Sequence, residues 1–351
     1  MRSISKFWIA LGPLSLLSTG VFAACDSADS ETAENGGRGG SSGSSATGGS
    51  SKGGSSTSGG ASPGGTSGAG GDSGSSSGGS AQGGSGGDGG DDTCTTLSSL
   101  TVATHVTLNV SWPGSLATME GDGVIHVWDL RRIEVSGTDF TSETQPCGTM
   151  LPPLSLSTIA GGGQSLLEVP AATWDLPSMP KIDGGGTLSG FAPGSSFVTD
   201  AQTTLIGHTM ADPNGPWPDD AGEIAPADHD GDSNDGITSI PRTDGDFVRP
   251  PTSILGQSGD VADQVYIVTR STFVHAGEFT SCTDIEGTTM ISFFDNHVVG
   301  CHVFEGDECS DGQADFIDSN RTVYEVTSAT FQSKVLDDTV TCVDARDALP
   351  P

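Results

Sequence analysis

The alternation of apolar and polar residues with a period of two is the feature that most limits the fold of this chain. A helix would scatter such residues around its axis, whereas a half-buried strand places the apolar ones against a core. Comparable runs occur at 123–135, 265–275, 297–304 and 321–335. The clearest run is 100–110, LTVATHVTLNV, where an extended chain places on one face Leu100, Val102, Val106, Leu108 and Val110.

Clusters of Gly, Pro, Asn and Asp separate these runs, and only 341–348, TCVDARDA, has the character of a short helix. Without crossover helices, neighbouring strands are expected to pair antiparallel. We therefore predict a mainly β fold, an antiparallel β-barrel or β-sandwich with long acidic loops.

Residues 93–351 carry nearly all of the large apolar side chains, which is enough to bury a sizeable core. We predict that this range is one disulfide-stabilised all-β domain. An organisation into two halves, about 93–207 and 261–351, joined by the acidic loop segment 208–260, stays open.

A Gly/Ser-rich tract precedes this domain. Residues 36–90 contain 25 glycines and 17 serines and show no periodic apolar face. Such a chain buries too little apolar surface to offset the entropy of ordering its backbone. We predict that residues 25–92 form a disordered Gly/Ser linker. Its glycine-rich tract would have an r.m.s. span of roughly 40 Å.

The N-terminus resembles an export signal. Arg2 and Lys6 precede a short apolar run at 7–18, and the segment VFAAC ends at Cys25. This pattern resembles the lipobox of bacterial lipoproteins, with Phe22 where that family usually has Leu. The resemblance implies that residues 1–24 are a cleaved signal peptide and that Cys25 carries diacylglycerol. An ordinary secretory signal is the alternative reading.

The predicted lipid anchor also determines the expected location of the protein in the cell. A lipid on Cys25 would hold the protein in the bilayer of the cell envelope, facing the periplasm or the cell surface. The formal net charge of −32 makes nucleic acid a poor partner, because the phosphate backbone would be repelled. Expected partners are therefore the lipid bilayer, another envelope component or a small ligand.

Six further cysteines agree with export, because an even number in an exported domain indicates disulfides. Sequence alone allows fifteen pairings. The pairing that we favour would fasten each half internally and close one short loop: Cys94–Cys147, Cys282–Cys342 and Cys301–Cys309.

The acidic stretch 228–239, DHDGDSNDGITS, is the candidate metal site. Its acidic residues resemble the Asp-rich calcium loops of EF-hands, dockerins and thrombospondin type 3 repeats. The resemblance is incomplete, because Ser233 replaces the usual glycine and Ser239 the usual glutamate. We predict a structural calcium site here, with a solvated acidic turn as the alternative. The expected ligands are Asp228, Asp230, Asp232, Asn234 and Asp235.

No catalytic motif stands out. Outside the Gly/Ser-rich tract 36–90, the chain has no G-x-S-x-G nucleophile elbow, and it has no H-E-x-x-H and no P-loop. The leading hypothesis is a lipid-anchored envelope protein whose β domain binds a ligand or has a structural role without catalysis. The alternative is a hydrolase acting on polysaccharide or ester bonds. A lined internal cavity would favour ligand binding, and a cleft with two facing carboxylates would favour a glycosidase.

Overall fold

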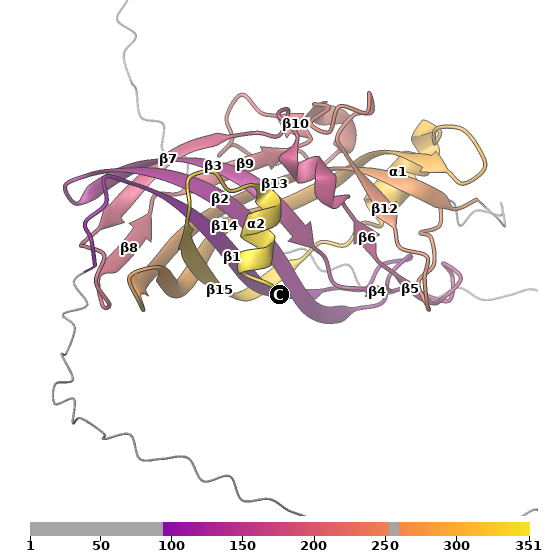
Figure 1. The fold of residues 1–351 in the computed structure, drawn as a ribbon. Helices are drawn as coiled ribbons and strands as arrows, with labels where there is room; N and C mark the ends of the chain where they lie inside the picture. Colours follow the sequence, from indigo (N-terminus) through magenta and orange to yellow (C-terminus); the bar gives the residue numbers. More distant parts are fainter. Residues whose placement is uncertain (1–93, 253–259) are drawn as a thin grey trace, which may run out of the picture. The chain divides into compact units, whose positions relative to one another are not determined.

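The structure, a computed structural model, describes residues 94–252 and 260–351, which belong to one compact unit (Figure 1). The predicted signal peptide 1–24, the anchor residue Cys25 and the linker 25–92 lie outside the described residues. None of the described helices has both the length and the apolar character needed to cross a membrane.

The prediction of a mainly β, antiparallel fold is confirmed. The long strands are β1 (Ser99–Trp112), β2 (Gly121–Ser136), β3 (Asp139–Met150), β13 (Ala262–Phe279), β14 (Asp284–Val303) and β15 (Glu325–Leu336). The short strands are β4 (Leu154–Ser155), β5 (Gln164–Ser165), β6 (Leu167–Glu168), β7 (Ile182–Leu188), β8 (Ser196–Thr199), β9 (Gln202–Ile206), β10 (His208–Thr209), β11 (Ala225–Pro226) and β12 (Ile237–Pro241).

The main sheet closes on itself. Its strands run in the order β12-β6-β3-β2-β1-β15-β14-β13-β8-β7, and β7 also pairs with β3. Near the other end, β12 pairs with both β13 and β6. The hydrogen-bonded path therefore returns to its start. Because β1 pairs with β15, strands from 93–207 and 261–351 share this sheet and do not form separate domains.

The structure contains elements outside the predicted runs, among them β12 and helix α1 (Asp311–Ser319). The segment 208–260, predicted to be a loop, contains β12, whose short run of ITSIP is too brief to show a clear period. Helix α1 was also missed, although Ser310 and Gln313 form a capping box that marks its start. The predicted C-terminal helix is confirmed as α2 (Cys342–Ala348). The remaining helical turns are the 3₁₀ segments η1 (Ala171–Asp175) and η2 (Ala221–Glu223).

The interior of the closed sheet is packed with apolar side chains near β7 and β8. The rings of Phe140 and Phe197 stack with centroids 5.4 Å apart, and Phe191 meets Phe279 edge-on at 5.8 Å. Because odd and even residues of a strand face opposite sides, the even residues of β1 point into this core. The packing fills this end of the interior.

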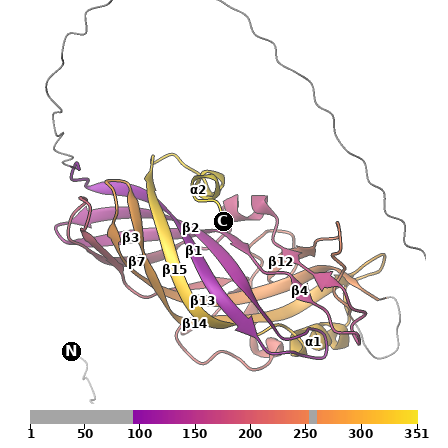
Figure 2. The same cartoon turned by 90° about the horizontal axis from the view of Figure 1, so that it is seen from below.

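A second core lies on the outer face, under α2, which crosses the strands of β1 and β2 (Figures 1 and 2). The Trp128 indole N–H donates to the carbonyl of Leu349 at 2.8 Å, and Arg346 donates to the carbonyl of Cys147. A helix of seven residues is too short to be stable alone. These tertiary contacts therefore hold α2 in place.

The cysteines are paired across the sheet, and two of the three predicted pairs are wrong. The structure joins Cys94 to Cys282, Cys147 to Cys342 and, as predicted, Cys301 to Cys309. The prediction assumed that each half is fastened internally. Because β1 lies beside β15, and β15 beside β14, the first strand instead meets the last part of the chain. The first two bridges therefore join the early part of the domain to the late part.

Candidate functional site

A cavity of about 210 Å³ lies within the described part of the chain. Its lining includes Ile237 of β12 and Phe316 and Ile317 of α1. These two elements lie towards the same end of the sheet (Figure 1). Its apolar wall comes from β2, β12, β13 and β14, and includes Val127, Ile237, Ile267 and Phe294. The strand alternation that buries these residues also determines which polar side chains enter the cavity.

Two charged side chains of β2 line this cavity. Asp129 and Arg131 are two residues apart, so both point to the same side of the strand as Val127. Their exposed fractions are 8% for Asp129 and 2% for Arg131. The described ion pairs engage other arginines, namely Arg132, Arg242, Arg270 and Arg321, and none includes Arg131.

Both charged groups also have unused hydrogen-bonding capacity. Among the described residues, Asp129 Oδ1 and Arg131 Nε are buried and have no hydrogen-bond partner. Burial raises the pKa of the Asp129 carboxyl, although the positive charge of Arg131 opposes that change. Burial likewise lowers the pKa of Arg131, which Asp129 opposes. A buried donor and a buried acceptor are thus available side by side on the cavity wall.

The polar residues around this pair are mostly satisfied. Gln202 exchanges hydrogen bonds with the hydroxyls of Ser142 and Thr144, at 3.3–3.4 Å. His275 Nδ1 lies 2.9 Å from the Thr289 hydroxyl. Burial, and then the nearby charge of Arg131, lower the pKa of His275 well below its usual value. His275 is therefore neutral and adds no second positive charge beside Arg131.

A further unpaired group lies towards α1. The hydroxyl of Thr322 lines the cavity, is buried and has no partner among the described residues, and only 7% of the residue is exposed. Polar groups of this kind normally find partners in a folded protein. The cavity thus carries unmet hydrogen-bonding groups near the middle of β2 and also just after α1.

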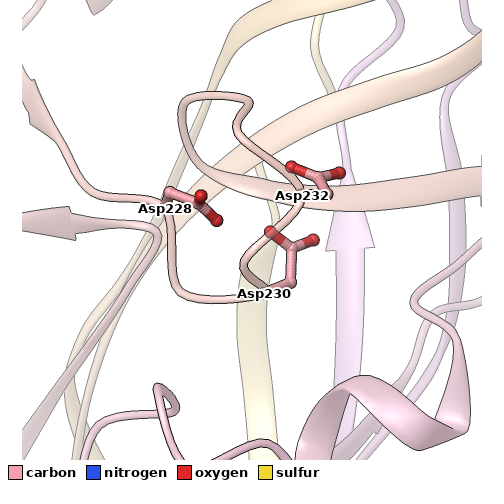
Figure 3. Close-up of side chains that lie close together, drawn as sticks. All are labelled: Asp228, Asp230 and Asp232. Carbon is pink, nitrogen blue, oxygen red and sulfur yellow. The ribbon is translucent and has the colours of Figure 1, made fainter.

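The acidic loop brings three of its predicted ligands together (Figure 3). Asp228, Asp230 and Asp232 each offer a carboxylate oxygen, and these oxygens lie within 4.8 Å of one another. The exposed Asp235 is not a member of this group. Asn234 donates its backbone N–H to Asp232 Oδ1 at 2.9 Å. These three aspartates stand at positions one, three and five of the loop 228–239. This alternating spacing brings their carboxylates close together, as the calcium-loop resemblance implies.

The backbone shapes this loop. Asp228 accepts hydrogen bonds from the backbone N–H groups of Gly231 and Ser233. Ser233 adopts φ of 77°, so it takes the left-handed conformation that glycine usually supplies at this loop position. The missing glycine therefore does not prevent the turn.

The loop is also connected to the cavity wall. Thr238, in β12, donates its backbone N–H to Asp230 at 2.7 Å and its hydroxyl to Asp232. Burial raises the pKa of Asp230, and the neighbouring charge of Asp232 raises it further. Asp230 Oδ1 is buried without a partner among the described residues. A cation here would neutralise the repulsion between these carboxylates and stabilise the start of β12.

A third polar cluster lies where β14 meets α1. His297 is fully buried, with Nδ1 2.9 Å from Asp318 and Nε2 2.9 Å from the carbonyl of Pro218. This arrangement contains the histidine and carboxylate of a hydrolytic triad, but the second ring nitrogen meets a backbone carbonyl and not a serine hydroxyl. Nearby, Arg270 is paired with Asp295 at 2.6 Å. We interpret both pairs as structural.

Comparisons with known proteins gave no match to a family model, to a curated protein or to a solved structure. The function is therefore inferred from the residues of this chain alone. Sequence reasoning found the acidic loop but missed Asp129 and Arg131. Their signal was two charges on the apolar face of a predicted strand, in the run GVIHVWDLRRIEV.

Proposed function

We propose that the domain binds a small molecule inside its closed sheet, and that the Cys25 lipid holds this domain at a membrane of the cell envelope. The observation that carries the binding proposal is the 210 Å³ cavity, whose wall presents buried polar groups without partners. Ligand sites in proteins typically combine an apolar lining with a few fixed polar groups. The lipobox resemblance supports the membrane anchor.

The cavity volume limits the ligand. An apolar protein cavity of about 150 Å³ is large enough for benzene. By that comparison, 210 Å³ holds a molecule of about eight to ten non-hydrogen atoms. Fatty acids and oligosaccharides exceed this size, so the expected ligand is a compact molecule that sits wholly inside the sheet.

The unpaired groups supply a driving force. A buried polar group without a partner costs about 1–3 kcal/mol, and more when it is charged. A ligand that hydrogen-bonds to both Asp129 and Arg131 would remove that cost. The apolar wall contributes in addition by removing the body of the ligand from water.

A hydrolase is supported less well. A glycosidase needs two carboxylates facing a shared substrate site. The lining residues of the cavity include Asp129 and Asp295, but the Asp295 carboxylate is bound to Arg270. The cavity therefore offers one carboxylate that is not in an ion pair, which suits binding better than hydrolysis.

We also propose that the acidic loop holds a structural calcium ion. The supporting observation is the convergence of Asp228, Asp230 and Asp232, with an unpartnered oxygen on Asp230. Calcium takes six to eight oxygen ligands, so Asn234, Asp235 or water would complete the shell. The ion would stabilise β12, which forms part of the cavity wall through Ile237.

The binding proposal is tested by saturation-transfer NMR on the full chain, in a detergent too large for the cavity. Toluene and indole are the probes. Saturation of the protein should transfer to both probes, because both match the cavity in size. In the variant Ser271→Phe, an aromatic ring projects into the cavity, and the transferred signal should fall at least fivefold.

The matched control is Val274→Phe, which adds the same ring to the same strand on its opposite face. Val274 pairs with Met290, which is 61% exposed. This variant should transfer signal like the wild type. Equal signals from the wild type and from Ser271→Phe would show that the probes bind elsewhere and would refute the proposal.

A further inference from the structure

We infer that the ligand of this cavity is a small monocarboxylate with an apolar body, bound through its carboxyl group by Arg131 and Asp129. This inference rests on the proposed function, because it names the chemical class of the molecule that occupies the cavity. It is carried by the Arg131 guanidinium and the Asp129 carboxyl group, whose Nε and Oδ1 atoms have no partner among the described residues, on an otherwise largely apolar wall.

The charges around the cavity leave Arg131 without a full counter-ion. Arg270 and Asp295 neutralise each other through their ion pair. The buried His275 is neutral, and burial raises the pKa of Asp129, although the charge of Arg131 opposes that change. An arginine keeps its charge in proteins, and a buried charge needs a partner of opposite sign. An anionic ligand supplies that partner.

The hydrogen-bonding groups also fit a carboxylate. One carboxylate oxygen can accept from Arg131 Nε, which has no partner among the described residues. The other oxygen can share a proton with Asp129, as two carboxyl groups do when they lie together in a buried site. A phosphate or sulfate carries more charge and has no apolar body, so it would leave the wall of Val127, Ile267 and Phe294 uncovered.

The size limit narrows the class further. A carboxyl group uses three non-hydrogen atoms, which leaves room for about six more by the volume comparison. A single six-membered ring or a short branched chain fills that space. Benzoate is therefore a suitable probe, and it has matched analogues that change only the polar group.

The test measures dissociation constants of the full chain by calorimetric titration with benzoate, benzamide, benzylammonium and toluene. Benzoate should bind at least tenfold more tightly than benzamide and toluene, and benzylammonium should bind most weakly. Charge-assisted hydrogen bonds account for a difference of this size. In Arg131→Met, benzoate should lose roughly 10- to 100-fold in affinity, while toluene should change less than about threefold.

A second variant guards against misfolding. Arg131→Met removes the positive charge beside the buried Asp129, so the double variant Asp129→Asn, Arg131→Met removes both charges together. Toluene binding to either variant shows that the cavity is intact. Equal affinity for benzoate and benzamide, or a preference for benzylammonium, overturns the carboxylate inference while leaving a ligand-binding cavity in place. Failure of all four probes to bind the wild type refutes the proposed function itself.

Discussion

The disulfide between Cys147 and Cys342 offers a quantitative test of the fold. It joins β3 to the first residue of α2, and both cysteines are completely or almost completely buried. Replacing both cysteines by alanine removes the covalent link and leaves the helix held by the hydrogen bonds from Trp128 and Arg346. We expect the free energy of unfolding to fall and α2 to open locally.

The expected loss follows from the length of the closed loop. The bridge spans 195 residues, for which the chain-entropy relation gives about 5 kcal/mol. The bridge between Cys301 and Cys309 spans 8 residues, and the same relation gives about 2.5 kcal/mol. The double substitution at 147 and 342 should therefore cost about twice as much as the double substitution at 301 and 309.

The assay is equilibrium unfolding in urea, followed by tryptophan fluorescence. Trp128 and Trp174 pack in the same cluster as Cys147 and Cys342, so their emission reports on this region. Amide exchange in 342–348 should accelerate in the variant before global unfolding. If removing the short bridge proves as costly as removing the long one, the assigned pairing and the role of α2 are wrong.

Three further predictions concern the anchor, the acidic loop and acid stability. Cys25→Ser should move the protein from the membrane fraction to the soluble fraction, because the predicted lipid is the only expected anchor. Calcium at a hundredfold excess over its dissociation constant should stabilise the wild type by about 2.7 kcal/mol in thermal melting, and Asp230→Ala, Asp232→Ala should abolish this effect. Burial, and then the nearby His126, lower the pKa of His105 to about 4. Since the unfolded value is 6.5, the unfolded state takes up the proton first, so stability should fall as pH drops from about 6.5 towards 4. His105→Gln should flatten that decline in urea midpoints.

Each of these predictions has a control. Membrane retention of Cys25→Ser after signal cleavage would contradict the lipoprotein interpretation. Magnesium at equal ionic strength separates calcium binding from charge screening, and an identical response of wild type and double variant would identify the loop as a solvated acidic turn. For His105, an unchanged pH profile in the glutamine variant would assign the acid sensitivity to other buried histidines.

The strands with a clear period of two were predictable because their side chains face two different environments. The period-two run at 100–110 became β1, since one face is packed inside the sheet and the other lies partly under α2. Strand β14 starts at Asp284, whereas the sequence pattern predicted a start at residue 297. The first half of β14 mixes polar and apolar residues, so its pattern did not predict a strand. This half is nevertheless a strand because it pairs with both β13 and β15. The local sequence pattern does not show which strands pair with each other.

Predicting the cysteine pairs requires the order of the strands in the sheet, and the period-two pattern does not give that order. Only Cys301 and Cys309 are close enough in sequence for a turn to bring them together. Likewise, Asp228, Asp230 and Asp232 converge because a local turn sets their spacing. The cavity depends on contacts between strands distant in sequence, so no short stretch of sequence reveals it.

The most direct test of ligand binding inside the sheet is a methyl NMR titration of the labelled full chain with toluene. Saturable shifts should appear at Val127, Ile237 and Ile267, which line the cavity. The exposed methyl groups of Ile240 and Met290 should not move. Shifts confined to the cavity methyls would support the account. Shifts at the exposed methyls without shifts in the cavity would contradict it.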